Sequence, residues 1–145
     1  RIGHHRRFRD FQLDGVGREW SAVIASERLP ADDYLRRHKT TVRGVYDAAL
    51  AGLPAPDVFD AIFLNARGEV CEGARSTVFI EEGRVLLTPP LASGCLAGVL
   101  RAELLASGRA VEAVLTETDL HAASAAGALY LGNALRGLVR VRLDF

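Results

Sequence analysis

Lys39, the only lysine of the chain, is the residue whose type points most directly to covalent chemistry. The sequence has 18 basic residues, and the other 17 are arginine. A guanidinium stays protonated in proteins, whereas a lysine amine can lose its proton and attack a carbonyl carbon. Lys39 directly precedes residues 40–50, whose apolar positions keep helical spacing. Because a helix N-terminus disfavours an added positive charge, this position favours the uncharged, nucleophilic amine.

The elements that would position this lysine form a mixed pattern of strands and helices. Apolar runs predict strands over 8–13, 20–25, 60–64, 69–72, 77–81, 85–88, 111–116, 128–131 and 138–143. Helices are predicted over 40–50, 98–107 and 119–125, the last with Thr118 as its N-cap. The polar segment 26–33 is predicted to be a loop. The fold class that we predict is therefore α/β, of the mixed α+β kind.

The composition argues against several classes of function. The formal net charge is zero, so no overall field favours nucleic acid or an anionic membrane. No apolar run reaches membrane-spanning length, and no signal-peptide pattern opens the chain. The two cysteines, Cys71 and Cys95, and the four histidines lack the spacing of a disulfide framework or a metal site. We expect a cytoplasmic protein with reduced thiols that binds no metal, nucleic acid or membrane.

Four sequence blocks follow one another in an order that is typical of one enzyme family. They are His38-Lys39-Thr40-Thr41-Val42-Arg43 with Tyr46-Asp47, residues 60–73 ending in Glu72-Gly73, residues 87–91 with 94–101, and residues 131–137. Together they resemble the class IV aminotransferases, the fold-type IV enzymes that carry pyridoxal phosphate, over roughly Arg9 to Val141. The lysine block is most similar to the aminodeoxychorismate lyase branch, including the lyase part of synthase–lyase fusions.

The resemblance implies pyridoxal phosphate as the cofactor and a role for each block. Lys39 would carry the cofactor and move the α-proton of the substrate. Glu72, at the end of a strand, would keep the pyridine nitrogen protonated, which makes the ring a better electron sink. The phosphate would rest on the start of the helix at 98–107, where oriented amides favour an anion, and on one turn residue. These phosphate contacts would be Gly98, Val99, Leu100 and Asn133.

Several residues of these blocks have two interpretations. Arg43 stands where the lyase branch often has arginine, and it could approach the cofactor or pair with Asp47 one helical turn on. Arg136 could bind a substrate carboxylate through two N–H groups or lie solvated on the surface, and the resemblance makes Ala134 a second substrate-binding residue. Tyr46 falls on the apolar face of its helix and is predicted to belong to the core rather than to the catalytic group.

The domain organisation follows from the same resemblance. Family members carry a small N-terminal domain that covers the cofactor, and most of it has no counterpart in this sequence. We therefore divide the chain into a residual end of that domain at 1–26, an interdomain linker at 27–36 and a cofactor-binding large domain at 37–145. The sequence contains no methionine, which favours its being part of a longer polypeptide.

The leading hypothesis for function is a lyase that converts 4-amino-4-deoxychorismate to 4-aminobenzoate and pyruvate in folate biosynthesis. A first alternative is a class IV aminotransferase acting on branched-chain or D-amino acids. A second is a truncated domain of the same fold without catalysis. By analogy with the family, we also expect a homodimer with a small-molecule substrate.

Overall fold

The computed structural model describes residues 19–29 and 40–144. Lys39, the predicted strand at 8–13 and most of the predicted linker lie outside the described residues. The described elements are β1 (Trp20–Leu29), α3 (Thr40–Ala51), β2 (Val58–Asn65), β3 (Val70–Gly73), β4 (Thr77–Glu82), β5 (Val85–Thr88), the short 3-10 helix η1 (Leu91–Ser93), α4 (Val99–Ala106), β6 (Ala110–Glu112), α5 (Glu117–Ala126), β7 (Leu129–Asn133) and β8 (Gly137–Leu143). This alternation of strands and helices confirms the predicted mixed α/β class.

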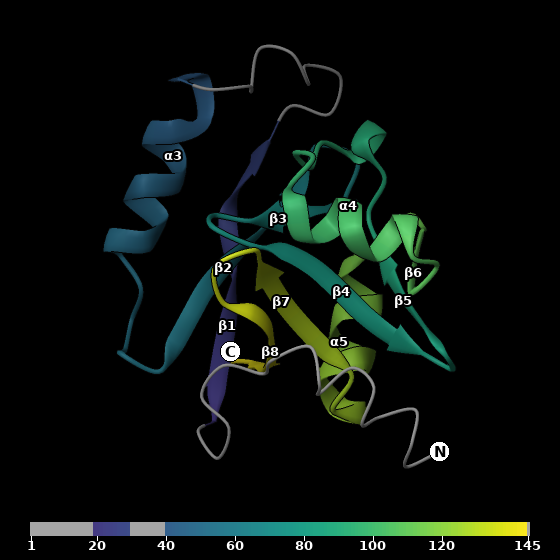
Figure 1. Ribbon diagram of the computed structural model, residues 1–145. Helices are drawn as coiled ribbons and strands as arrows, with labels where there is room; N and C mark the ends of the chain where they lie inside the picture. Colours follow the sequence, from purple (N-terminus) through teal and green to yellow (C-terminus); the bar gives the residue numbers. More distant parts are fainter. Residues whose placement is uncertain (1–18, 30–39, 145) are drawn as a thin grey trace.

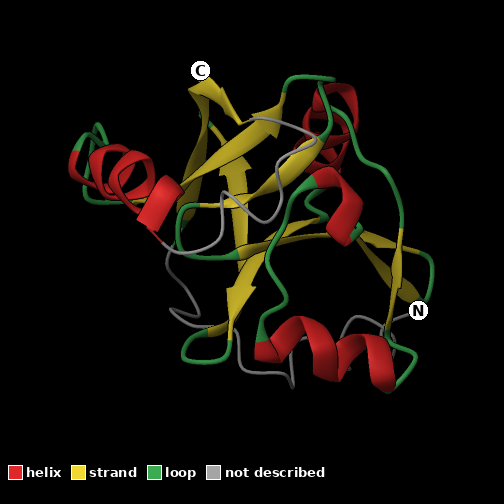
Figure 2. Ribbon diagram, turned by 90° about the horizontal axis from the view of Figure 1, so that it is seen from above, coloured by secondary structure: helices red, strands yellow, loops and turns green. Residues whose placement is uncertain are grey.

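The strands form one sheet with the order β3-β2-β1-β8-β7-β4-β5-β6. The pairs β2–β3, β4–β5 and β7–β8 are antiparallel hairpins, whereas β1 runs parallel to both of its neighbours, β2 and β8. Figure 1 and Figure 2 show α3 on one side of the molecule, with α4 and α5 on the other. Because β1 pairs with β8, segments from the two halves of the sequence lie side by side in the middle of the sheet.

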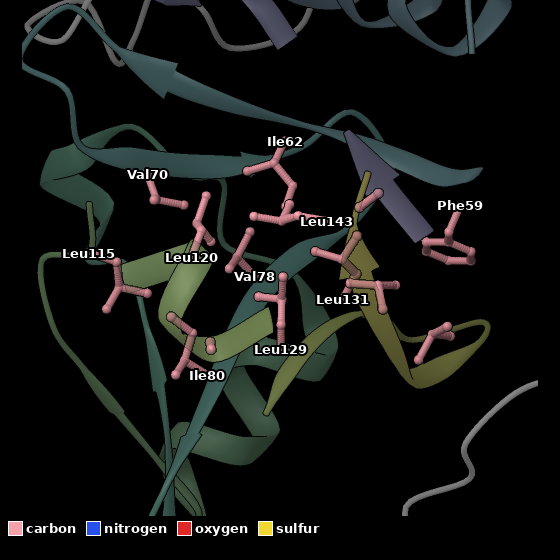
Figure 3. Packing of buried hydrophobic residues seen from close by; sticks show 14 of the residues in the cluster. Phe59, Ile62, Val70, Val78, Ile80, Leu115, Leu120, Leu129, Leu131 and Leu143 are labelled. Carbon is pink, nitrogen blue, oxygen red and sulfur yellow. The ribbon is translucent and has the colours of Figure 1, made fainter. Parts of the chain in front are cut away.

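Helices α4 and α5 cover opposite faces of the sheet, and the period-two alternation of the strands explains why. In β4, Val78 belongs to the cluster that also contains Leu120 of α5, whereas its neighbour Phe79 packs with Leu100 and Leu104 of α4. Successive side chains of a strand point to opposite faces, so one apolar strand can serve two cores. Figure 3 shows the first of these cores, with Leu120 and Leu115 beside Val78 and Ile80.

Three local predictions are corrected by the structure. The N-cap of α5 is Thr116 and not Thr118, because the Thr116 hydroxyl accepts from the Asp119 amide while the Asp119 carboxylate accepts from the Thr116 amide. This reciprocal capping box satisfies two backbone donors at once. The predicted strand at 111–116 is shorter, ending at Glu112.

The third correction concerns the segment predicted to be a loop at 26–33. Its first four residues continue β1 to Leu29, because they pair with β2 through Arg28 and Leu29. The predicted division between residues 26 and 27 thus falls within a strand of the sheet. The assignment of domains to the chain stays a prediction.

Candidate functional site

A cavity of about 240 Å³ opens between α3, β3, the start of α4 and the turn that joins β7 to β8. It brings together predicted site residues that are up to 62 positions apart in the sequence. Six of them line it: Glu72, Gly98, Val99, Leu100, Asn133 and Ala134. The sequence blocks that contain these residues lie around the same cavity. What the residues bind stays a prediction.

Glu72 lines this cavity, and both of its carboxylate oxygens accept hydrogen bonds. Its Oε2 accepts a 2.6 Å hydrogen bond from the Tyr46 hydroxyl, and its Oε1 accepts one of 2.9 Å from the Leu96 amide. The side chain is almost fully buried, and a carboxylate in such a place requires donors of this kind. Helix α3, strand β3 and the segment before α4 therefore meet at this one carboxylate.

The start of α4 lies on the same cavity and has no side-chain cap. Gly98 is the N-cap residue, and among the described residues no side chain makes a capping hydrogen bond to the first turn. The first amides of a helix have no partner within the helix, and their dipoles favour a negative charge. Val99 and Leu100, which follow Gly98, also line the cavity. This end of the cavity is suited to an anion.

Arg101, the third residue of α4, adds a buried positive charge to that end. It is 4 % exposed, and its Nη2 donates to the Pro89 carbonyl and to the Glu112 carboxylate. Its Nε, although buried, has no hydrogen-bond partner within the described part of the chain. Because a buried N–H without a partner costs free energy, this atom is a candidate for contact with a ligand.

The segment that joins β3 to β4 forms one wall of the cavity, and Asp60 of β2 holds it in place. Asp60 Oδ1 accepts from the amides of Ala61 and Ala74, at 2.8 and 3.1 Å. Its Oδ2 accepts from the Arg75 amide at 3.0 Å and from the Ser76 hydroxyl at 2.6 Å. Burial raises the pKa of the Asp60 carboxyl, while the hydrogen bonds from Ser76, Arg75 and Ala61 oppose that rise.

Gly73 is required where this wall approaches Asp60. A Cβ atom at Gly73 would overlap with the Asp60 carboxylate and lie 2.6 Å from the Ser76 hydroxyl oxygen. Any larger residue would therefore push the wall away from the carboxylate that anchors it. The missing side chain of Gly73 lets the wall pack closely against β2. This close approach is a physical reason for a glycine directly after Glu72.

Asn133 lines the cavity, but its side chain also connects two of its walls. Its Nδ2 donates to the Arg75 carbonyl at 2.9 Å, and its Oδ1 accepts from the Arg136 amide at 2.8 Å. The side chain thus ties the β3–β4 segment to the β7–β8 turn. Asn133 would therefore keep these two hydrogen bonds while also contacting an anion in the cavity.

The two remaining arginine predictions lie at or beyond the edge of the site. Arg136 is half-buried, and its guanidinium carbon lies 5.4 Å from the ring centre of Phe59 and 5.9 Å from that of Trp20. Arg43 is exposed on α3 and is not among the residues that line the cavity. Lys39 directly precedes α3 in the sequence and lies outside the described residues.

Besides the wall between β3 and β4, four residues that build the site were not singled out as such from the sequence. They are Asp60, Tyr46, Leu96 and Arg101. Asp60 carried a signal, since it is a carboxylate within the otherwise apolar strand β2, and a buried carboxylate needs several donors. Tyr46 is in the core, as its position on the helix predicts, with its ring 5.0 Å from that of Phe63. Its hydroxyl, however, reaches the predicted functional carboxylate.

A polar cluster behind the cavity fixes the segment before α4. Glu69 Oε1 accepts from Asn65 at 3.1 Å and from the Ser93 hydroxyl at 3.0 Å, and it forms an ion pair with Arg67. Hydrogen bonds from Arg67 and Asn65 lower the pKa of Glu69 from 4.5 to about 2. The cluster links the β2–β3 turn to η1, which precedes the Leu96 amide in the chain.

Comparison with protein families and solved structures gives a consistent picture. The family described as amino-transferase class IV matches residues 14–143. A solved chain from Mesorhizobium loti, proposed to be an amino-acid aminotransferase, is 40 % identical with a TM-score of 0.79 over 92 % of this chain and 64 % of its own length. A Legionella pneumophila chain, proposed to be a 4-amino-4-deoxychorismate lyase, is 26 % identical with a TM-score of 0.74 over 87 % of this chain and 48 % of its own.

One curated relative matches a shorter stretch. A Thermotoga maritima protein, proposed to be a branched-chain-amino-acid aminotransferase, is 36 % identical over 76 residues, which are 52 % of this chain and 28 % of the relative. The chain thus spans less than a third of this relative in the matched stretch, and under two thirds of each of the two solved chains. Within the described residues, no group of three or more metal-ligating side chains occurs, and no helix has the length and hydropathy to span a membrane.

Proposed function

Because the chain belongs to the class IV aminotransferase family, whose members are pyridoxal-phosphate enzymes, we propose that it is a pyridoxal-phosphate lyase of 4-amino-4-deoxychorismate. The products would be 4-aminobenzoate and pyruvate. The observation that carries the proposal is the cavity, which both Glu72 and the uncapped start of α4 line. The lysine block and the likeness to the Legionella pneumophila protein support the choice of reaction.

The residues present fit pyridoxal phosphate in the chemistry of their donors and acceptors. A phosphate dianion suits the first amides of α4 and the buried, unpartnered Nε of Arg101. A protonated ring nitrogen suits the Glu72 carboxylate, which accepts hydrogen bonds from two donors of the protein. The aldehyde of the cofactor requires a primary amine, and Lys39 is the one lysine in the sequence.

In this proposal each part of the site has a defined task. Bound pyridoxal phosphate would supply an electron sink for the negative charge that develops at the carbon bearing the substrate amine. Glu72 would hold the proton on the ring nitrogen, and the start of α4 would bind the phosphate. Lys39 would take the proton from the amine-bearing ring carbon, after which the C–O bond to the enolpyruvyl group breaks and the carbocycle becomes aromatic. The enolpyruvyl group leaves with its oxygen and takes up a proton to give pyruvate.

Reductive labelling tests the cofactor assignment directly. Borohydride reduction of the chain loaded with pyridoxal phosphate should fix the label on Lys39, and Lys39→Arg should lose it while keeping the charge. Because no other lysine exists, label elsewhere can only be on the terminal amine. Label at that terminus alone, or no binding at all, contradicts the proposal and favours the non-catalytic domain.

A second candidate function is an aminotransferase for amino acids. The 40 % identity to the Mesorhizobium loti protein and the 36 % identity to the Thermotoga maritima protein favour it. Product analysis separates the two reactions, since the lyase forms 4-aminobenzoate and pyruvate, whereas the aminotransferase forms a keto acid from an amino acid. Further proposals from the family are the homodimer, the cytoplasmic location and the binding of the substrate by Arg136 and Ala134.

A further inference from the structure

Tyr46 and Glu72 come from different elements and form one buried contact at the cavity. The tyrosine hydroxyl donates to Glu72 Oε2 at 2.6 Å, across 26 positions of sequence. Both side chains line the cavity, and less than a tenth of each residue's surface is exposed. Short hydrogen bonds to an ionised acceptor are stronger than neutral ones. The contact therefore acts on a carboxylate that lines the cavity.

The surroundings of Tyr46 fix the direction from which its hydroxyl approaches. Its ring packs against Phe63 in a cluster that also contains Leu29, Ala61 and Cys71. Cys71 directly precedes Glu72 in β3. A ring held on an apolar cluster has little freedom to turn, so the hydroxyl is presented to the carboxylate from a fixed position.

The second donor completes the orientation of the carboxylate. The Leu96 amide donates to Glu72 Oε1 at 2.9 Å, so each oxygen has a donor from a different wall. Two donors at two oxygens define the plane of a carboxylate, which one donor cannot do. Each carboxylate oxygen can accept more than one hydrogen bond, so this arrangement is compatible with a further donor from a ligand.

We propose that Tyr46 is a positioning residue that fixes the orientation of the Glu72 carboxylate, which would face the ring nitrogen of the cofactor. This inference rests on the proposed function and deepens it. Packing of the Tyr46 ring needs no hydroxyl, whereas this proposed role depends on the hydroxyl. Tyr130 differs from Tyr46, because its hydroxyl donates to Glu81 at 3.4 Å and its side chain does not line the cavity.

The test compares binding of two cofactor forms by equilibrium titration followed by absorbance and fluorescence. One is pyridoxal phosphate, and the other is its analogue with C–H in place of the ring nitrogen. Tyr46→Phe keeps the ring and removes only the hydroxyl. We expect it to weaken binding of pyridoxal phosphate about tenfold, because a hydrogen bond to a charged group is lost, and to leave binding of the analogue unchanged. Tyr130→Phe is the matched control and should change neither affinity.

The combination with Glu72→Gln provides a second measurement. If Tyr46 acts through Glu72, the double variant should bind pyridoxal phosphate as Glu72→Gln alone does. Equal losses for both cofactor forms in Tyr46→Phe, or no loss in either, would overturn the inference. So would an additive loss in the double variant. If the unsubstituted chain binds neither form, the proposed function itself fails, which is a distinguishable result.

Discussion

The carboxylate of Asp60 and the hydroxyl of Ser76 lie 2.6 Å apart, and this contact joins β2 to the wall of the cavity. Asp60 also accepts from three backbone amides, two of them in the same wall. The Ala74 amide also donates to the Ala61 carbonyl at 3.0 Å, so the buried carboxylate supplements the backbone hydrogen bonds where β3 ends and β4 has not yet begun. The position of the wall depends on a side chain that is itself not in contact with the cavity.

Asp60→Asn should destabilise the fold by about 2 kcal/mol, because one acceptor oxygen becomes an NH2 group that faces backbone donors. The measurement is the free energy of unfolding in urea. Asp57→Asn, at an exposed position just before β2, is the control and should change stability by less than about 0.5 kcal/mol. A loss at Asp60 no larger than at Asp57 would show that the wall does not depend on the carboxylate.

Gly73→Ala should also destabilise the protein and displace the wall, because the added methyl group overlaps with the Asp60 carboxylate. We expect a cost of about 1–3 kcal/mol, as for other overpacked positions. Gly44→Ala is the matched control, since a Cβ atom at this exposed position in α3 meets no atom within 4 Å. That change should stabilise the helix by about 0.5–1 kcal/mol. Losses of similar size at both positions would contradict the close approach at Gly73.

The free energy of unfolding should depend on pH through the ionisation of Glu69. Its pKa is lowered from 4.5 to about 2 in the folded protein by Arg67 and Asn65, so its contribution to stability is fully present above pH 4.5. That contribution is lost as the pH falls toward about 2. The measurement is the difference in unfolding free energy between the unsubstituted chain and Glu69→Gln from pH 7 to pH 2. Taking the difference cancels the opposite contribution of Asp60, and a difference independent of pH would refute the shift.

The sequence predicted the elements of the fold well because their signals are local. The helix at 40–50 and the hairpin strands at 77–81 and 85–88 each show their period within a short window, and the structure agrees within about two residues. The corrected N-cap of α5 was also a local signal. Thr116 and Asp119 have the spacing of a capping box. The predicted helix begins at residue 119, two residues later than α5, and this late start places the predicted N-cap at Thr118.

The site was predictable only in part, because its contacts join distant segments. Glu72, Gly98 and Asn133 could be placed in one site by resemblance, and the cavity brings them together. The Tyr46–Glu72 contact depends on how far α3 lies from β3, which no periodicity encodes. The predicted end of β1 falls short for the same reason, since Ser26, Glu27 and Arg28 are polar and the strand continues only because Arg28 and Leu29 pair with β2.

Thr116→Ala should destabilise the protein by about 1 kcal/mol, because it removes the side chain that caps α5. Thr118→Ala, two positions on and exposed, should change stability by less than about 0.5 kcal/mol. Thermal and urea unfolding of the two variants give the comparison. The reverse order of the two effects would restore Thr118 as the cap.

Arg101→Gln tests the anion end of the cavity under the proposed function. The substitution removes the guanidinium, including its unpartnered Nε, and introduces no second amine that could react with an aldehyde. We expect pyridoxal phosphate to bind about tenfold more weakly, because a charge-assisted contact with the phosphate is lost. Pyridoxal, which has no phosphate, should bind as it does to the unsubstituted chain. Arg84→Gln, in the exposed β4–β5 turn, is the control for a general change of charge. Equal losses for the two ligands would mean that Arg101 only supports the fold through Pro89 and Glu112.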